Sequence, residues 1–178
     1  LAELLGGGVL FGDQGVWVYD IYYRSEVEFS EKVVAVLIER LRLLAEERLV
    51  LLKQAACIQG EISVELLQVT SGFSLEKIGP RLWEPVQLDL LHENPGGFVF
   101  AHDRILKAVE RLLNQGEAEE IHRRLVAFFL AQERKGGVKA DISTLLHHYQ
   151  FYGHGVTDES IKREMAGYYF QAGEQARN

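Results

Sequence analysis

A histidine that could bind phosphate and an adjacent aspartate that could cap a helix stand where a strand is predicted to run into a helix. Residues 98–113 read FVFAHDRILKAVERLL, with strand formers at 98–100 and apolar residues at helical spacing after Asp103. An Asp at that boundary accepts hydrogen bonds from the free amides of the first turn, so Asp103 is predicted to cap the helix. His102 would lie at the positive end of the helix dipole, where phosphate is favoured and ring protonation would strengthen the contact. The alternative for His102 is a hydrogen bond to a neighbouring backbone carbonyl.

The other histidines and the single cysteine predict no catalytic residue and no metal site. His147, His148 and His154 are close in sequence, but adjacent histidines diverge by about 100° on a helix and no HExxH motif or carboxylate partner follows. A solvated helix face with one half-buried ring is the favoured interpretation. Cys57 stands in an apolar run and is interpreted as a small buried hydrophobic residue. Cys57 and His122 show no local nucleophile–base signature.

No nucleotide-hydrolysing core is recognisable in the sequence. Residues 6–8 are three consecutive glycines, but no Gly-Lys-Ser/Thr follows, so a helix end leading into a hairpin is favoured over a phosphate loop. The chain also lacks a strand that ends in the acidic pair that binds magnesium in P-loop ATPases. We therefore predict that this chain alone does not hydrolyse ATP and is not an enzyme.

Composition and charge exclude several classes of protein. The 178 residues are 47% hydrophobic and 25% charged, which is typical of a globular protein. The net charge of −7 argues against a dominant nucleic-acid surface, because Lys and Arg supply most non-specific affinity for nucleic acid. No apolar run is long enough for a membrane helix, no signal peptide is recognisable, and one cysteine permits no internal disulfide. A cytoplasmic location is expected, and the first residue, Leu1, indicates an excerpt of a longer protein.

The first half of the chain predicts a hairpin followed by helices. Residues 9–11 and 16–19 are strand-like and flank a turn at 12–15. Ser30 and Glu31 are predicted to open the first helix, and a second covers residues 46–58. A third helix has Ser63 as its cap and ends at 71–72. The fourth runs from Ser74, with a partial capping box, to about residue 86, and its two prolines predict a kink or two short pieces.

A second hairpin is predicted from residues 88–91 and 98–100, closed by an Asn-Pro-Gly-Gly turn. Three helices followed by a two-stranded wing are typical of a winged-helix domain. Further helices are predicted near 103–113, 117–134, 141–151 and 158–176, with a turn at 153–155. The predicted fold is mostly α in three parts: a hairpin and helical lid at 1–48, a winged helix at 49–115, and antiparallel helices opening a TPR-like array at 116–178.

Residues 98–113 resemble the segment that follows the wing in signal-transduction ATPases with numerous domains (STAND), a branch of the AAA+ P-loop NTPases. The similarity is greatest to the ATPase module of large bacterial sensor kinases and transcriptional activators. Residues 39–60, ERLRLLAEERLVLLKQAACIQG, resemble the same family, as does the weak pattern of Phe11, Trp17 and Asp20. The resemblance covers about residues 1–135. Ala45 stands where the family commonly has proline, Asp89 where glycine usually precedes the wing, and Gln59-Gly60 adds one residue to a usual Ile-Gly junction.

The resemblance implies a role in a nucleotide-dependent signalling switch. It makes His102 the contact to the β-phosphate of ADP, supplied jointly with an upstream P-loop ATPase domain, and Asp103 the cap that orients His102. The parent protein would use ADP and ATP with magnesium, and would couple the winged helix to a helical repeat and to sensor or output domains. Two other functions stay open: a nucleotide-independent scaffold whose exposed aromatic residues bind a partner protein, and a DNA-binding winged helix. The helix at 74–86 has nearly balanced charge, which disfavours DNA.

Overall fold

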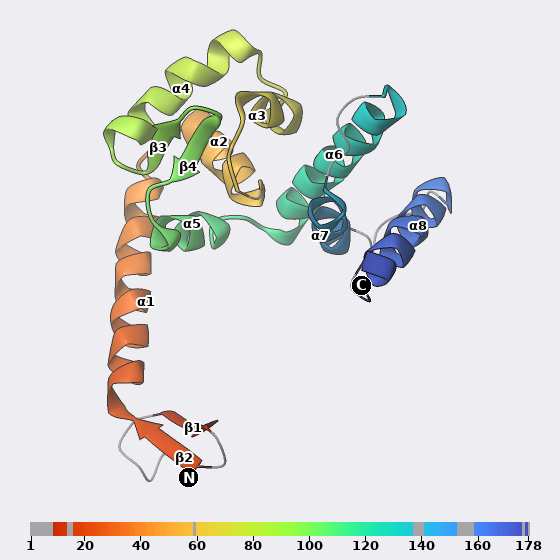
Figure 1. Ribbon diagram of the computed structural model, residues 1–178. Helices are drawn as coiled ribbons and strands as arrows, with labels where there is room; N and C mark the ends of the chain where they lie inside the picture. The colour runs from red at the N-terminus through yellow and green to blue at the C-terminus, as the bar shows by residue number, and fades with distance from the viewer. Residues whose placement is uncertain are drawn as a thin grey trace.

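The structure is a computed structural model that describes residues 9–13, 16–58, 60–136, 141–152, 159–175 and 177, with side chains from residue 31 to 174 and at 177 (Figure 1). This part of the chain is mostly helical and contains two separate two-stranded antiparallel hairpins. The helices are α1 (Ile21–Leu41), α2 (Glu46–Cys57), α3 (Val64–Ser71), α4 (Leu75–Gln87), α5 (Asp103–Glu110), α6 (Gln115–Arg134), α7 (Ile142–Tyr152) and α8 (Glu159–Gln175). The strands are β1 (Val9–Asp13), β2 (Val16–Asp20), β3 (Leu91–Asn94) and β4 (Gly97–Phe100).

Helix α1 is a long arm that carries the β1–β2 hairpin at one end and packs on α5 near the other (Figure 1). The hairpin agrees with the prediction, although the expected glycine turn at 6–8 and part of the turn at 12–15 lie outside the described residues. The predicted helix start at Ser30 is wrong, because α1 begins at Ile21. Residues 21–41 contain no Gly or Pro, so nothing stops the helix from continuing through Ser30.

Helices α2, α3 and α4 follow in the predicted order. Ser63 caps α3 as predicted, since its hydroxyl accepts a hydrogen bond from the amide of Leu66 at 3.2 Å. Gly72 ends α3 in a left-handed conformation with φ of 74°. Ser74 lies at the start of α4, but its hydroxyl makes no capping bond, so the predicted capping box is wrong. The amide of Lys77 is instead bound by the carbonyl of Ser74 at 2.9 Å.

Helix α4 is continuous through Pro80 and Pro85, which contradicts the two-piece alternative. Each proline removes one donor and leaves the carbonyl four residues earlier without its helical bond. The first such carbonyl belongs to Glu76, an exposed residue, so solvent can reach it. The Arg81 side chain adds a bond to the helix by donating to the carbonyl of Lys77 at 2.9 Å.

The second hairpin is shifted from its predicted position. Its first strand is Leu91–Asn94 rather than 88–91, and it pairs with Gly97–Phe100 so that Leu91 faces Phe100. Residues 88–90 form a turn instead, because the amide of Leu90 donates back to the carbonyl of Pro85 at 2.9 Å and Asp89 has a positive φ of 53°. A third short segment joins the hairpin, since Ile62 and Phe98 exchange two backbone hydrogen bonds of 2.8 and 3.0 Å.

Two hydrophobic cores lie side by side and share α6. The first contains residues of α1 to α6, from Val34 through α2 and α4 to Leu125. The second joins α6, α7 and α8 around Val126, Leu145 and Met165. Phe129 packs against both cores. The first core thus includes residues from all three predicted parts of the chain, and the division at 48/49 and 115/116 stays a prediction.

A capping box that was not predicted from the sequence begins α6. The Asn114 side chain accepts from the amide of Glu117 at 2.9 Å, and the Glu117 carboxylate accepts from the amide of Asn114 at 3.0 Å. Glu117 also accepts from Nζ of Lys53 on α2 at 2.9 Å, and these hydrogen bonds lower the pKa of its carboxyl. The same carboxylate therefore starts α6 and ties it to α2.

We expect Asn114→Ala to lower the free energy of unfolding by about 1 kcal/mol, because the first turn of α6 loses its cap. Chemical denaturation followed by circular dichroism measures the change. Asn114→Ser retains a capping oxygen and is the matched control. A loss of equal size in both variants would contradict the role of the cap.

None of the helices in the described part of the chain has the length and apolar character needed to cross a bilayer.

Candidate functional site

His102, rather than Asp103, is the cap of α5. The backbone of His102 is extended, with φ of −157° and ψ of 144°, and its ring Nδ1 accepts a hydrogen bond from the amide of Arg104 at 3.1 Å. Asp103 is already the first helical residue. The sequence prediction of Asp103 as the cap is therefore wrong by one residue. An imidazole nitrogen that reaches the amide two residues ahead fills the role usually taken by a short oxygen-bearing side chain.

The capping bond determines which nitrogen of His102 can donate. Because Nδ1 accepts from a backbone amide, the neutral ring carries its proton on Nε2. His102 is exposed, so its Nε2–H is available to a ligand outside the chain. A proton on Nδ1 would remove the acceptor of the capping bond, whereas Nε2–H is a donor in both forms of the ring and can reach a phosphate oxygen.

Asp103 lies in the wall of a groove of about 730 Å³ formed by the end of α2, β4, α5, the start of α6 and α7. Its lining includes two carboxylates, two side-chain amides and four rings, and its other lining residues are apolar. The polar and aromatic side chains are those of Asp103, Glu110, Asn114, Gln115, Phe100, His122, His147 and Phe151. No Lys or Arg is among the described residues that line it. The groove is thus unfavourable for an anion, and His102 is not one of its lining residues. A phosphate held by His102 would have to lie outside the groove.

A histidine pair that joins α6 to α7 was not predicted from the sequence. His122 and His148 are 4% and 1% exposed, and their Nδ1 atoms lie 2.9 Å apart. Phe151 stacks on the His122 ring with centroids 4.5 Å apart, and Phe129 stacks on the His148 ring at 5.9 Å. Burial lowers the pKa of His122 to about 4 and that of His148 to about 3. Both rings are therefore neutral near pH 7.

The predicted single half-buried ring at 147–148 is wrong in part, because His148 is fully buried and has a partner on another helix. The two members of the pair are 26 residues apart, so local spacing could not reveal them. One signal was present: His122 precedes Val126 and Leu130 by four and eight residues, which is the spacing of one helix face, and both of these apolar residues are buried. His154 lies outside the described residues, and within those residues no group of three His, Cys, Asp or Glu side chains has metal-binding geometry.

Cys57 is a buried free thiol at the end of α2, as its interpretation as a hydrophobic residue predicted. Burial, with smaller contributions from Glu110 and Glu117, raises the pKa of this thiol to about 12. The sulfur therefore stays protonated near neutral pH and is a poor nucleophile. His122 lines the same groove, but its partner is His148.

Comparisons of the chain with protein-family models, curated protein sequences and solved structures found no match.

Proposed function

We propose that this chain is a regulatory segment of a nucleotide-dependent signalling ATPase of the STAND type. In this proposal a winged helix senses bound ADP through His102 and relays the nucleotide state to the helices that follow. The observation that carries the proposal is the position of His102 at the start of α5. His102 is exposed and uses Nδ1 for the capping bond, so its Nε2–H can donate to a ligand.

The order of elements supports a winged-helix assignment for the middle of the chain. Helix α2 is followed by the short strand at Ile62, then α3 and α4, then the β3–β4 hairpin that pairs with Ile62 through Phe98. Helix, strand, helix, helix and hairpin is the order of a winged-helix domain, in which the hairpin is the wing. Helix α5 follows the wing directly, so His102 would sit at the point where the wing leads back to the body of the domain.

The chemistry of the site favours a shared nucleotide pocket. A helix N-terminus and one imidazole N–H favour a phosphate oxygen, whereas the Asp103 carboxylate beside them disfavours the same anion. One donor opposed by one carboxylate gives little affinity alone. The proposal therefore assigns most of the ADP contacts, and the magnesium, to an upstream P-loop domain. His102 would report whether the winged helix is closed on that domain.

A physical route leads from His102 to the neighbouring helices. Helix α5 packs on α1 and α2, and Arg111 after α5 forms an ion pair with Glu31 of α1 at 2.7 Å. Helix α2 in turn packs on α6 and is tied to it by Lys53 and Glu117. Movement of α5 on exchange of ADP for ATP would therefore be transmitted to α6 and to the TPR-like helices α7 and α8.

The test is isothermal titration of ADP into this chain and into the longest natural protein that contains it. We expect binding only to the longer protein, and a loss of about tenfold in affinity with His102→Ala, since a hydrogen bond to a charged group is removed. His92→Ala is the matched control, because His92 is an exposed histidine on β3. Unchanged ADP affinity in the His102 variant would contradict the sensor role.

A partner-binding scaffold is the alternative that a specific observation favours. Phe151 of α7 and Tyr169 and Phe170 of α8 are exposed, with Phe170 at 68%. Such residues are enriched at protein interfaces. DNA binding by α4 is less well supported, because its Arg81 is engaged by Glu47 at 2.7 Å and leaves few cations for phosphate. If the titration showed no binding of ADP to the longer protein, the scaffold would be the favoured function. The cytoplasm stays the expected location in either case.

A further inference from the structure

We propose that the histidine pair, His122 of α6 and His148 of α7, is an acid-sensitive latch that holds α7 on α6 when both rings are neutral and releases it when they are protonated. The proposal does not depend on nucleotide binding. It rests on the contact between the two rings, their burial and the position of the pair between α6 and α7.

The hydrogen bond between the two rings is compatible with only some of their protonation states. With 2.9 Å between the Nδ1 atoms, one ring donates its Nδ1–H and the other accepts with its Nδ1 lone pair. One ring is thus the Nδ1–H tautomer and the other the Nε2–H tautomer. A first added proton would leave a charged ring in an apolar site. A second would place two N–H groups face to face and abolish the hydrogen bond.

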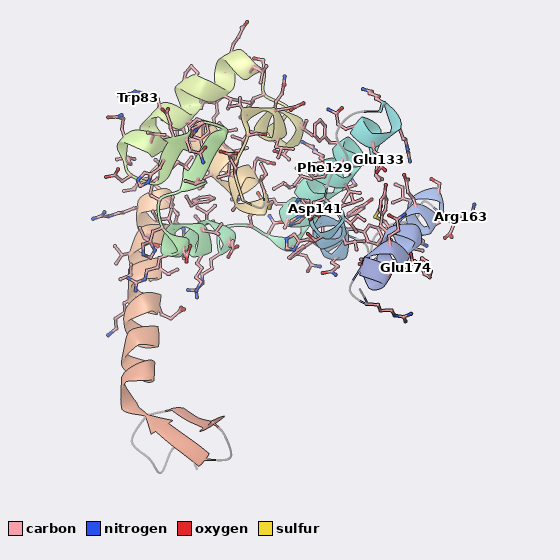
Figure 2. All side chains as sticks on the ribbon, viewed as in Figure 1. Trp83, Phe129, Glu133, Asp141, Arg163 and Glu174 are labelled. Atoms are coloured by element: carbon pink, nitrogen blue, oxygen red, sulfur yellow. The ribbon has the colours of Figure 1, made fainter. Side chains whose placement is uncertain are left out.

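The surroundings of the pair offer little compensation for positive charge. Phe129 of α6 and Phe151 of α7 stack on the two rings. Figure 2 labels Phe129 on α6 and Asp141 next to α7, which marks the two helices that the pair joins. Among the described residues, the charges that change the pKa values of the pair are those of His122 and His147. Both charges lower the pKa of the ring on which they act.

Carboxylates on the neighbouring elements are engaged elsewhere or exposed, so none neutralises a charged ring. On α6, Glu120 is engaged by Arg123 and Arg124 at 2.6 and 2.8 Å. On α8, Glu164 pairs with Arg134 at 2.7 Å. Other titratable groups on these elements include Tyr152 and His147 of α7, Cys57 of α2, and Asp103 and Glu110 of α5 across the groove, and Glu117 of α6 is paired with Lys53 of α2 at 2.9 Å. The two α5 carboxylates are exposed and contribute no shift to either ring.

Release of the pair would act on α7 and α8 together. Helix α7 packs on α6 on one side and on α8 on the other, and the second core is built from these three helices alone. The first core does not depend on α7 or α8. Protonation of the pair is therefore expected to loosen the second core while α2 to α5 stay folded.

The direction of the pH effect follows from linkage. Both rings titrate below the ordinary value near 6.5 while buried, so the open state binds more protons than the closed one. The latch is fully closed above about pH 6.5 and weakens as the pH falls toward 4. At pH 5.5 the charged form of an exposed imidazole outnumbers the neutral form by about ten to one. Each ring therefore raises the ratio of open to closed protein about tenfold, and the two rings together raise it about a hundredfold.

The test is hydrogen exchange of α7 amides at pH 7.5 and 5.5, corrected for the intrinsic pH dependence of exchange, with α2 amides as the internal reference. We expect the opening constant of α7 to rise about a hundredfold at pH 5.5. His148→Phe should reduce that factor to about ten, because one titrating ring remains, and His122→Phe with His148→Phe should abolish it. His92→Gln, on the exposed face of β3, should retain the full factor.

Nitrogen-15 spectra of the imidazoles in the unaltered protein provide a second measurement. It needs no substitution, so a variant that fails to fold does not affect it. We expect one Nδ1–H and one Nε2–H tautomer at pH 7.5, with both rings titrating below pH 5. An opening constant that is the same at both pH values, or midpoints near 6.5 for both rings, would overturn the latch. A pH dependence that persists in the double variant would also overturn it.

Discussion

Leu52→Ala is expected to lower the free energy of unfolding by about 3 kcal/mol, because it removes buried atoms and leaves a cavity in a close-packed site. Leu52 is 0% exposed and lies on α2, which contacts α3, α4, α5 and α6. No single neighbouring helix can collapse into the space without disturbing its contacts with the others. Urea denaturation monitored by circular dichroism measures the loss as a lower midpoint with an unchanged slope.

Leu43→Ala is the matched control for the same change of side chain. Leu43 is 86% exposed and follows α1. Its truncation is expected to change the free energy of unfolding by less than about 0.5 kcal/mol. If Leu52→Ala behaved like Leu43→Ala, α2 would not be the centre of the first core.

Gly97→Ala is expected to cost about 3 kcal/mol, because it combines backbone strain with a collision. Gly97 has φ of 151°, and a Cβ atom there would lie 2.2 Å from the carbonyl oxygen of Ile62. That oxygen accepts from the amide of Phe98 at 3.0 Å, so it cannot move away without breaking the contact between Ile62 and the hairpin. Strain of about 1–3 kcal/mol and one or two lost hydrogen bonds of about 1 kcal/mol each give the expected size.

Gly72→Ala separates these two contributions. Gly72 also has a positive φ, of 74°, but no atom lies within 4 Å of the position that its added methyl group would take. Only backbone strain of about 1 kcal/mol is therefore expected. Thermal denaturation gives the two stabilities, and hydrogen exchange at Ile62 and Phe98 reports on the hairpin. Equal losses in the two variants, or unchanged protection of Ile62 in Gly97→Ala, would contradict the collision.

Features that depend on neighbouring residues in the chain were predictable. The Ser63 cap, the Gly72 helix end and both hairpins were identified because caps and turns are formed by residues a few positions apart. The capping box of Asn114 and Glu117 is equally local and was recognisable from its spacing. The mostly helical class followed from apolar residues at helical spacing, which mark the side of each helix that must be buried.

Boundaries were less predictable, because two local solutions of similar energy compete there. A capping residue can be Asp103 or His102, and the extended backbone after β4 places the His102 ring on the Arg104 amide. The strand predicted at 88–91 competes with a turn that returns the Leu90 amide to Pro85 at the end of α4. The position of the cap thus depends on β4, and the turn at 88–90 depends on the end of α4.

The sequence by itself determined the number and order of the helices and hairpins in the described part of the chain and which side of each helix is apolar, because these properties depend on short-range sterics and on spacing. It did not determine the start of α1 or the turn at 88–90. Only the tertiary structure decided that His122 meets His148, that Asp103 faces a groove and that His102 does not. Those contacts join residues far apart in the chain, and they depend on how α5, α6 and α7 pack around shared cores. Burial in that packing turns two ordinary imidazoles into a neutral pair.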